Sequence, residues 1–212
     1  MVLSNKSWAQ QRTTTFLSKR IHAEVRAGFT SSNLATPYND DIRSSASKVG
    51  FYGGLVLEYP LSEILYLRPG FIVTSKGGKL DVDYEGDKAM TLNGVYFQVP
   101  IYFSAKLSLE RYNNSINLNV GPYVAYGFAG NMSYKPWGSN TPYSSSSFGK
   151  NGPLNRLDVG LGGECQFEYH NKIIFTLGSE VGMTRAVKNG VVDGISDVIG
   201  NSVGYLSVGY KF

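Results

Sequence analysis

Residues 157–168 read LDVGLGGECQFE, and this stretch decides the class of fold. Its odd-numbered positions are apolar apart from one glycine, whereas its even-numbered positions carry acids, glycines and a glutamine. Successive side chains of a β-strand point to opposite faces, so alternation with a period of two predicts a strand with one apolar and one polar face. A surface helix would instead repeat its apolar positions every three or four residues.

The same alternation returns seven more times along the chain, and no residue on the apolar face of any run is charged. The other runs cover residues 21–29, 51–59, 65–74, 95–106, 116–128, 175–183 and 205–212. The sequence therefore predicts an all-β fold of eight antiparallel strands in up-and-down order.

The links between the runs are of two kinds that alternate strictly. The links after the second, fourth and sixth runs are short, at residues 60–63, 108–115 and 170–172. The other four are long, at residues 30–48, 75–91, 130–153 and 184–201. Short periplasmic turns and long extracellular loops are typical of outer-membrane barrels. We therefore expect an eight-stranded transmembrane β-barrel whose two termini both lie in the periplasm.

Composition excludes several other classes of protein. Mean hydropathy is −0.16, and no stretch approaches the roughly 20 consecutive apolar residues that a spanning helix needs. The net charge of +4 is spread along the chain, so nothing supports nucleic-acid binding. The single cysteine, Cys165, permits neither an internal disulfide nor a cysteine-based metal site. Residues 1–20 are polar and contain no apolar signal region, so we expect them to form a periplasmic segment, followed by the barrel at 21–212. Two alternatives stay open for the export signal, which was either cleaved off or omitted from this sequence.

The polar face of the strands is predicted to line the barrel lumen rather than to face water. Nine glycines fall on this face, where a solvated strand would gain nothing from them but a narrow lumen needs them beside bulky tyrosines. Desolvated charges must pair, and both signs occur there. The expected lumenal charge network comprises Glu24, Arg26, Glu58, Arg68, Lys106, Glu164, Glu180 and Lys211.

Candidate catalytic and metal sites are few. The only histidines are His22, on the lumenal face, and His170, in a turn, and neither has a serine at suggestive spacing, so we expect no enzyme and no cofactor. The second long link resembles the start of a calcium loop, but Leu92 stands where the closing glutamate should be. A solvated hairpin tip is favoured over a calcium site at Asp81, Asp83, Glu85 and Asp87.

Two long loops are candidate partner-binding surfaces. The third loop mixes aromatic residues with flexible serines, and the fourth is unusually apolar. A merely mobile third loop and a fourth loop packed over the barrel mouth stay open as alternatives. The candidate residues are Tyr134, Trp137, Tyr143, Val191, Val192 and Ile195.

The chain also resembles the PorT-type outer-membrane β-barrel proteins, which are common in Bacteroidetes. The resemblance covers residues 21–212 and rests on the segments 50–55, 58–62, 67–71, 75–78, 95–100, 121–124 and 206–212. Gln98 stands where the family usually has glutamate. The resemblance implies a C-terminal signal for the barrel-assembly machinery at Tyr210 and Phe212, and we expect the terminal Phe212 to point inward. Family members include a protein needed for secretion of surface proteins, and the shared fold does not specify an activity.

The sequence thus favours a non-enzymatic outer-membrane protein that binds a partner, as an accessory of a secretion or surface-protein complex. The expected partners are membrane lipid, the assembly machinery, and another outer-membrane or periplasmic protein. Two alternatives stay open: a small channel or ligand-binding barrel, and a lipid-modifying enzyme.

Overall fold

The computed structural model describes residues 21–34, 42–82, 88–109, 113–134, 143–149, 152–188 and 200–212. Eight long strands account for most of them, and two short strands, β2 (Ile42–Ala46) and β7 (Tyr143–Ser146), are added in the long links. The long strands are β1 (His22–Leu34), β3 (Lys48–Pro60), β4 (Leu65–Val82), β5 (Lys88–Leu109), β6 (Asn114–Tyr134), β8 (Leu157–Tyr169), β9 (Ile173–Gly182) and β10 (Asn201–Lys211).

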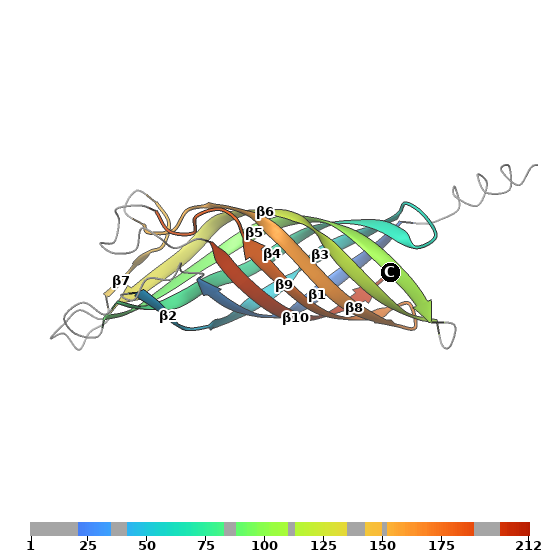
Figure 1. Ribbon diagram of the computed structural model, residues 1–212, viewed down its shortest axis with the longest axis horizontal. Coiled ribbons are helices and arrows are strands. Elements are labelled where there is room, and N and C mark those ends of the chain that lie inside the picture. Colours follow the sequence, from blue (N-terminus) through green and yellow to red (C-terminus); the bar gives the residue numbers. More distant parts are fainter. Residues whose placement is uncertain are drawn as a thin grey trace, which may run out of the picture.

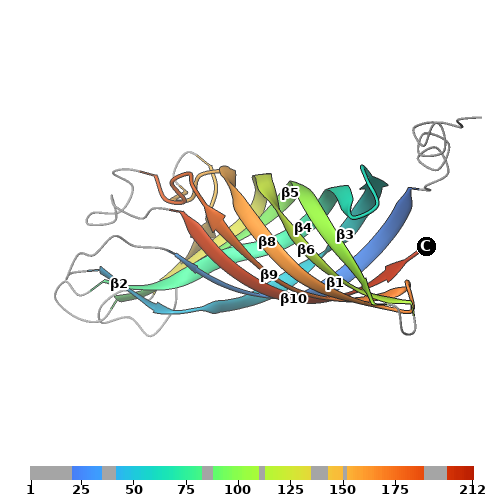
Figure 2. The ribbon, with the colours of Figure 1, turned by 45° about the vertical axis from the view of Figure 1, so that its right-hand side comes forward.

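The eight long strands close into an antiparallel barrel, as the alternating sequence predicts (Figures 1 and 2). Each pairs with the next in the order β1, β3, β4, β5, β6, β8, β9, β10, and the first pairs with the last, for example through Val25 and Tyr210. A closed sheet leaves no strand edge unpaired along the barrel wall.

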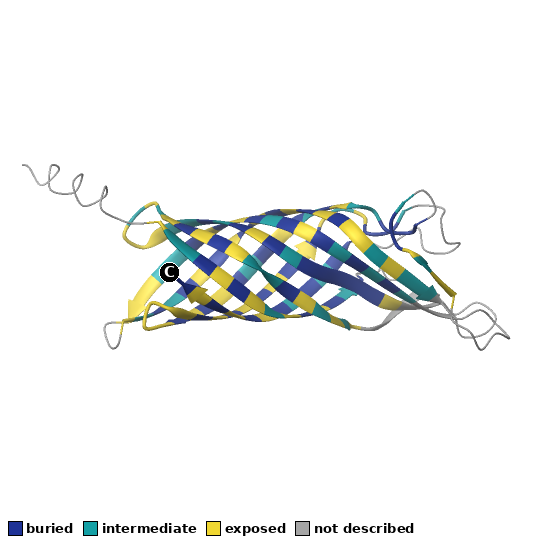
Figure 3. Cartoon of the chain, turned by 180° about the vertical axis from the view of Figure 1, so that it is seen from behind, coloured by how far each residue is buried: buried dark blue, intermediate teal, exposed yellow. Residues whose placement is uncertain are grey.

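The barrel wall has an exposed apolar outer face and a buried inner face, which gives the checkerboard of Figure 3. In β9, residues alternate one by one between exposed and buried over the whole strand. Leu177 on the outer face is 61% exposed, whereas its neighbour Thr176 is 3% exposed. Among the described residues there is no helix with the length and hydrophobicity needed to cross a membrane.

One end of the barrel, here called the short-turn end, carries the turns at residues 61–64 and 170–172, the start of β1 and the end of β10 (Figure 1). His170 and Asn171 have φ of 51° and 55°, and the amide of Lys172 donates to the carbonyl of Tyr169 at 3.1 Å. Two successive residues of positive φ make the tight hairpin turn that suits the twist of paired strands.

The expected inward direction of the terminal Phe212 is wrong, because its side chain is 70% exposed. Leu206, Val208 and Tyr210 are all exposed in the preceding strand. The period of two places residue 212 on the same outer face as these three residues.

The opposite end, called the long-loop end, differs from the sequence prediction. Residues 75–91 were expected to form a loop, but β4 and β5 stay paired out to Val82 and Lys88. Strand β6 continues beside β5 to Tyr134, while β2 adds to β4 and β7 adds to β6. The result, called the long-loop sheet, has the order β2–β4–β5–β6–β7 and lies away from the C-terminus in Figure 1. Hydrogen bonds between the main chains of β4, β5 and β6 form in water as well as in lipid. These strands can therefore stay paired beyond the part of the barrel that crosses the bilayer.

The apolar outer face leads to a first prediction. Leu161 is 53% exposed on the outside of β8, and replacing it by arginine should lower the free energy of unfolding by roughly 2–4 kcal/mol if that face lies in the bilayer. Ser144→Arg, on an exposed position of β7, serves as the control and should change it by less than about 0.5 kcal/mol. The measurement is urea unfolding of the barrel in lipid vesicles, and equal effects of the two variants would contradict the assignment.

Candidate functional site

Two arginines that share one carboxylate lie at the centre of the lumen. Arg26 contacts Glu24 at 2.9 Å and reaches across the barrel to Glu164 at 2.6 Å. Arg68 pairs with the same Glu24 and with Glu58, the latter at 3.0 Å. These five side chains are almost completely buried, and they come from β1, β3, β4 and β8. Charge-assisted pairs of this kind are the strong hydrogen bonds of a protein interior.

A second group of charges lies toward the short-turn end. Lys106 contacts Glu168 at 2.8 Å and Glu58 at 3.6 Å. Lys211 of the last strand pairs with Glu168 and lies 3.8 Å from Glu58. Because Glu58 also binds Arg68, this group is continuous with the central one.

A third group lies toward the long-loop end around Lys76, which is fully buried. Its ammonium lies 3.1 Å from Asp158 and 3.3 Å from Glu180, and 4.0 Å above the ring of Tyr123. Neutral donors complete the shell, since the Tyr123 hydroxyl donates to Asp158 at 3.3 Å and the Gln98 amide donates to Glu180 at 2.6 Å.

The three groups contain six carboxylates and five cations, all in ion pairs. The first two groups balance, with Arg26, Arg68, Lys106 and Lys211 against Glu24, Glu58, Glu164 and Glu168. The third group has one cation, Lys76, for two carboxylates, Asp158 and Glu180. Hydrogen bonds from the neutral side chains of Gln98 and Tyr123 stabilise the negative charge that Lys76 does not balance. A desolvated charge persists only with such partners.

Aromatic rings fill much of the remaining lumen. Tyr52 and Tyr205 stack with centroids 4.4 Å apart, and the Tyr205 hydroxyl donates to Glu164 at 2.8 Å. A Cβ atom added at Gly178 would lie 2.2 Å from the Tyr205 ring, so this glycine makes room for the tyrosine. The lumen is therefore packed rather than open at this level.

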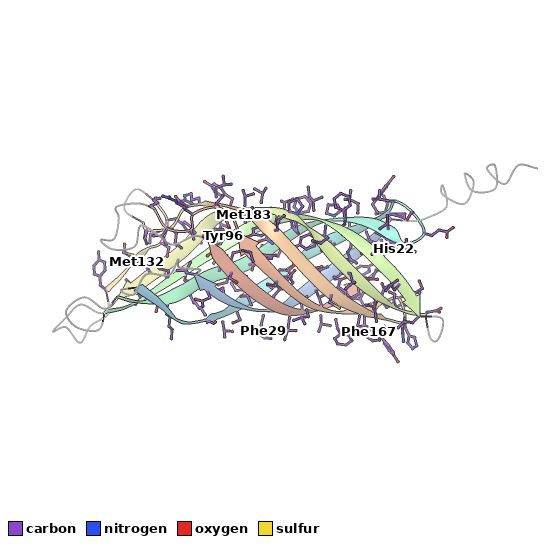
Figure 4. All side chains as sticks on the ribbon, viewed as in Figure 1. His22, Phe29, Tyr96, Met132, Phe167 and Met183 are labelled. Carbon is purple, nitrogen blue, oxygen red and sulfur yellow. The ribbon has the colours of Figure 1, made fainter. Side chains whose placement is uncertain are left out.

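Segments of the third and fourth long links cover the lumen at the long-loop end. Phe148 is 5% exposed and meets the ring of Tyr96 edge to face at 5.5 Å. Leu154 bridges to Val187, and both are buried in the same apolar cluster. A Cβ atom at Gly127 would lie 2.3 Å from Phe148, so this glycine accommodates the cover rather than a lumenal tyrosine. Figure 4 shows Tyr96 on the long-loop side of the middle of the barrel and His22 near the short-turn end.

The short-turn end carries a small hollow of about 250 Å³ at the mouth of the lumen. Its lining includes His22, Tyr66, Lys106 and Lys211. The His22 Nδ1 atom lies 3.1 Å from the main-chain oxygen of Phe212, and the His170 ring lies 4.1 Å from that of Tyr169. Neither contact is with a hydroxyl nucleophile.

The structure brings together all eight residues of the expected charge network, seven of them buried and Lys106 half-buried. It adds three that the sequence reasoning left out of the network, namely Lys76, Asp158 and Glu168. Lys76 was missed because its strand was expected to end at Thr74. One more step of the same alternation would have placed it in the lumen.

Most of the candidate loop residues lie outside the described residues. Trp137, Val191, Val192 and Ile195 fall there, as do Asp83, Glu85 and Asp87 of the calcium candidate. For Tyr134 and Asp81 the structure gives the strand position alone. Tyr143 lies in β7 and is 53% exposed. Within the described ranges, no three histidine, cysteine or acidic side chains converge on a possible metal position.

A closed antiparallel barrel with an apolar outer face and an ion-paired lumen defines the class of integral outer-membrane β-barrels. The chain belongs to the outer membrane protein beta-barrel domain family, whose match covers residues 8–187. It is therefore a protein of the outer membrane.

Three of the solved structures to which the chain is similar come from Yersinia pestis, Pseudomonas aeruginosa and Neisseria. Ail, the attachment invasion locus protein of Yersinia pestis, is 16% identical at a TM-score of 0.48, over 92% of this chain and 100% of that one. The outer membrane protein OprG of Pseudomonas aeruginosa is 13% identical at 0.48, over 92% and 97%. Neisserial surface protein A is 12% identical at 0.43, over 89% and 95%. A comparison with curated proteins finds no match.

The charge network leads to a second prediction. Arg68→Ala leaves Glu24 and Glu58 short of a partner in a desolvated lumen, which should cost roughly 3–5 kcal/mol of unfolding free energy. The control Ser144→Ala, on an exposed position of β7, should cost less than about 0.5 kcal/mol. Denaturant unfolding in vesicles measures both, and a neutral Arg68→Ala would show that water screens the lumenal charges.

Proposed function

We propose that this protein is a non-enzymatic, PorT-type member of its family that binds another protein at its long-loop end. In this role it serves as an accessory of a secretion or surface-protein complex. The PorT-type resemblance of segments such as 50–55 and 206–212 supports the finer assignment. The orientation that we propose places the long-loop end outside the cell, with the short turns, the start of β1 and the end of β10 in the periplasm.

The observation that carries the proposal is the long-loop sheet. Barrel strands need only about ten residues to cross the bilayer, yet β5 and β6 have 22 and 21. Their outer parts pair with each other, β5 also pairs with β4, and the added strands β2 and β7 pair with β4 and β6. Such a sheet is a preorganised surface, and preorganisation lowers the entropic cost of binding a partner.

The lumen argues against the channel alternative. Ion pairs from Lys211 at one end to Lys76 near the other occupy its length, and Phe148 and Leu154 lie over the long-loop mouth. A conducting pore of this architecture has a water-filled lumen instead. The enzyme alternative gains no support from the two histidines, because the His22 ring contacts a main-chain oxygen and the His170 ring packs on a tyrosine ring.

The proposed orientation gives a third prediction. In a Cys165→Ala background, cysteine at Ser145 in β7 should react with a membrane-impermeant maleimide on intact cells. Cysteine at Ser62 in a short turn should react only after the outer membrane is opened. The reverse pattern would reject the orientation while leaving the barrel itself unaffected.

A fourth prediction tests partner binding. Tyr143 is an exposed aromatic on the long-loop sheet, and Tyr143→Ala should lower the recovery of a co-purifying protein by about tenfold, as loss of an interface anchor does. The control His170→Ala, at the other end, should leave recovery unchanged. The measurement is mild-detergent purification from native membranes with quantitative mass spectrometry.

Steady conductance of the purified wild type in planar bilayers, together with no partner lost in Tyr143→Ala, would replace the proposal by the channel alternative.

A further inference from the structure

The lipid-facing side of the barrel has a hollow of about 440 Å³ across β1, β10, β9 and β8. Two rows of outward side chains border it. One row runs Phe167–Phe175–Val208–Ala27 and the other Cys165–Leu177–Leu206–Phe29, each residue paired with the next across neighbouring strands. We call this hollow the lipid-face trough.

The floor of the trough is main chain rather than side chain. Gly28 and Ser207 are paired across β1 and β10, Ser207 is paired with Thr176 of β9, and all three line the hollow between the two rows. Ser207 and Thr176 are buried on the inner face, and Gly28 has no side chain. Each row also ends on a small residue, Ala27 at one corner and Cys165 at the opposite one. The trough is therefore deep where the side chains are small, and it is bordered by phenylalanines that project outward, as Phe29 and Phe167 do in Figure 4.

The shape and chemistry of the trough fit a hydrocarbon chain. Its lining on the outer face is wholly apolar, so a polar ligand would lose its hydrogen bonds there. A flexible linear chain can follow a furrow between two rows of side chains, and its gain rises with every methylene that it buries. A flat apolar protein surface would instead span the rows and leave the furrow empty, which costs dispersion contacts.

A cationic turn lies beyond the first row of the trough, on its β8 and β9 side. Phe167 and Phe175 are the paired residues of the trough closest to the 170–172 turn, and Lys172 is three residues from Phe175 along the strand direction, or roughly 10 Å. Lys172 and His170 are exposed there, and the turn contains no acid, since residues 169–173 read YHNKI. The nearest acid in β8, Glu168, points into the lumen and is fully buried. The flexible stem of a lysine can follow the apolar surface while its ammonium stays at the polar boundary.

We propose that the lipid-face trough binds one acyl chain of an anionic glycerophospholipid, whose headgroup rests against Lys172. The apolar furrow selects the chain, and the exposed positive charge of the turn selects a headgroup with net negative charge. This site is on the outer wall of the barrel and is separate from the proposed protein-binding surface at the long-loop end.

The sole cysteine of the chain provides the test, because Cys165 lies in the trough and is exposed. The rate of its alkylation by N-ethylmaleimide is measured on the full chain in detergent, after removal of native lipid, with added dioleoylphosphatidylglycerol or dioleoylphosphatidylcholine. We expect phosphatidylglycerol to protect Cys165 at a concentration about fivefold lower than phosphatidylcholine, the ratio expected for one lysine at a charged surface. Lys172→Gln should abolish that difference without changing protection by phosphatidylcholine.

Two controls separate a built site from general coating by lipid or detergent. In a Cys165→Ala background, Ile101→Cys places the thiol on the outer face of β5, across the barrel, where both lipids should protect equally. Ala27→Phe fills the trough without touching the turn, and native mass spectrometry should then show the bound phosphatidylglycerol lost while the barrel stays folded.

Three results would overturn the proposal. They are equal protection of Cys165 by the two lipids, a phosphatidylglycerol preference in the Ile101→Cys control as strong as at Cys165, and protection that rises with protein concentration in the absence of lipid. The last result would assign the trough to a second copy of the chain.

Discussion

Every main-chain amide in a barrel that crosses a bilayer has to be paired within the sheet, because hydrocarbon offers no other hydrogen-bonding partner. Closure of β1 onto β10 meets this requirement here. Closure also divides the side chains into two environments, lipid outside and a narrow lumen inside. The alternating sequence follows from that division, and so does the need to fill the lumen without leaving any charge unpaired.

The lumenal ion pairs connect strands that the sheet keeps apart. Arg26 of β1 reaches Glu164 of β8, and Lys76 of β4 reaches Asp158 of β8, although neither pair of strands is adjacent in the barrel. Main-chain hydrogen bonds fix each strand only against its two neighbours. The side-chain ion pairs therefore connect non-adjacent strands across the lumen. Their geometry depends on the register of every strand in the barrel wall.

The two ends of the barrel differ in structure, because the requirement that every main-chain amide be paired within the sheet applies only inside the bilayer. At the short-turn end, a two-residue turn such as His170–Asn171 only reverses the chain. At the long-loop end, strands β4, β5 and β6 run on and collect two further strands, while Phe148 and Leu154 pack over the lumen. Outer-face positions are free of lumenal packing, which lets small residues such as Ala27 and Cys165 stand among phenylalanines and shape a surface toward lipid.

The sequence by itself determined the eight strands, the face of most of their side chains and eight of the eleven residues that carry the lumenal charge. A period of two is a local property of the sequence, so it can be recognised without knowing the fold. It was sufficient to place Glu24, Arg26 and Arg68 in the lumen. The expected inward direction of Phe212 was wrong because it departed from this rule, since continued alternation puts residue 212 on the outer face, where the structure has it. Only the tertiary structure decided which charges meet, because partners such as Arg26 and Glu164 are 138 residues apart and their contact depends on barrel stagger. It alone also decided that residues 75–82 and 88–91 pair as strands, that Lys76 meets Asp158, and that Gly127 makes room for Phe148. These outcomes depend on long-range register and on packing between distant segments, neither of which leaves a periodic mark in the sequence.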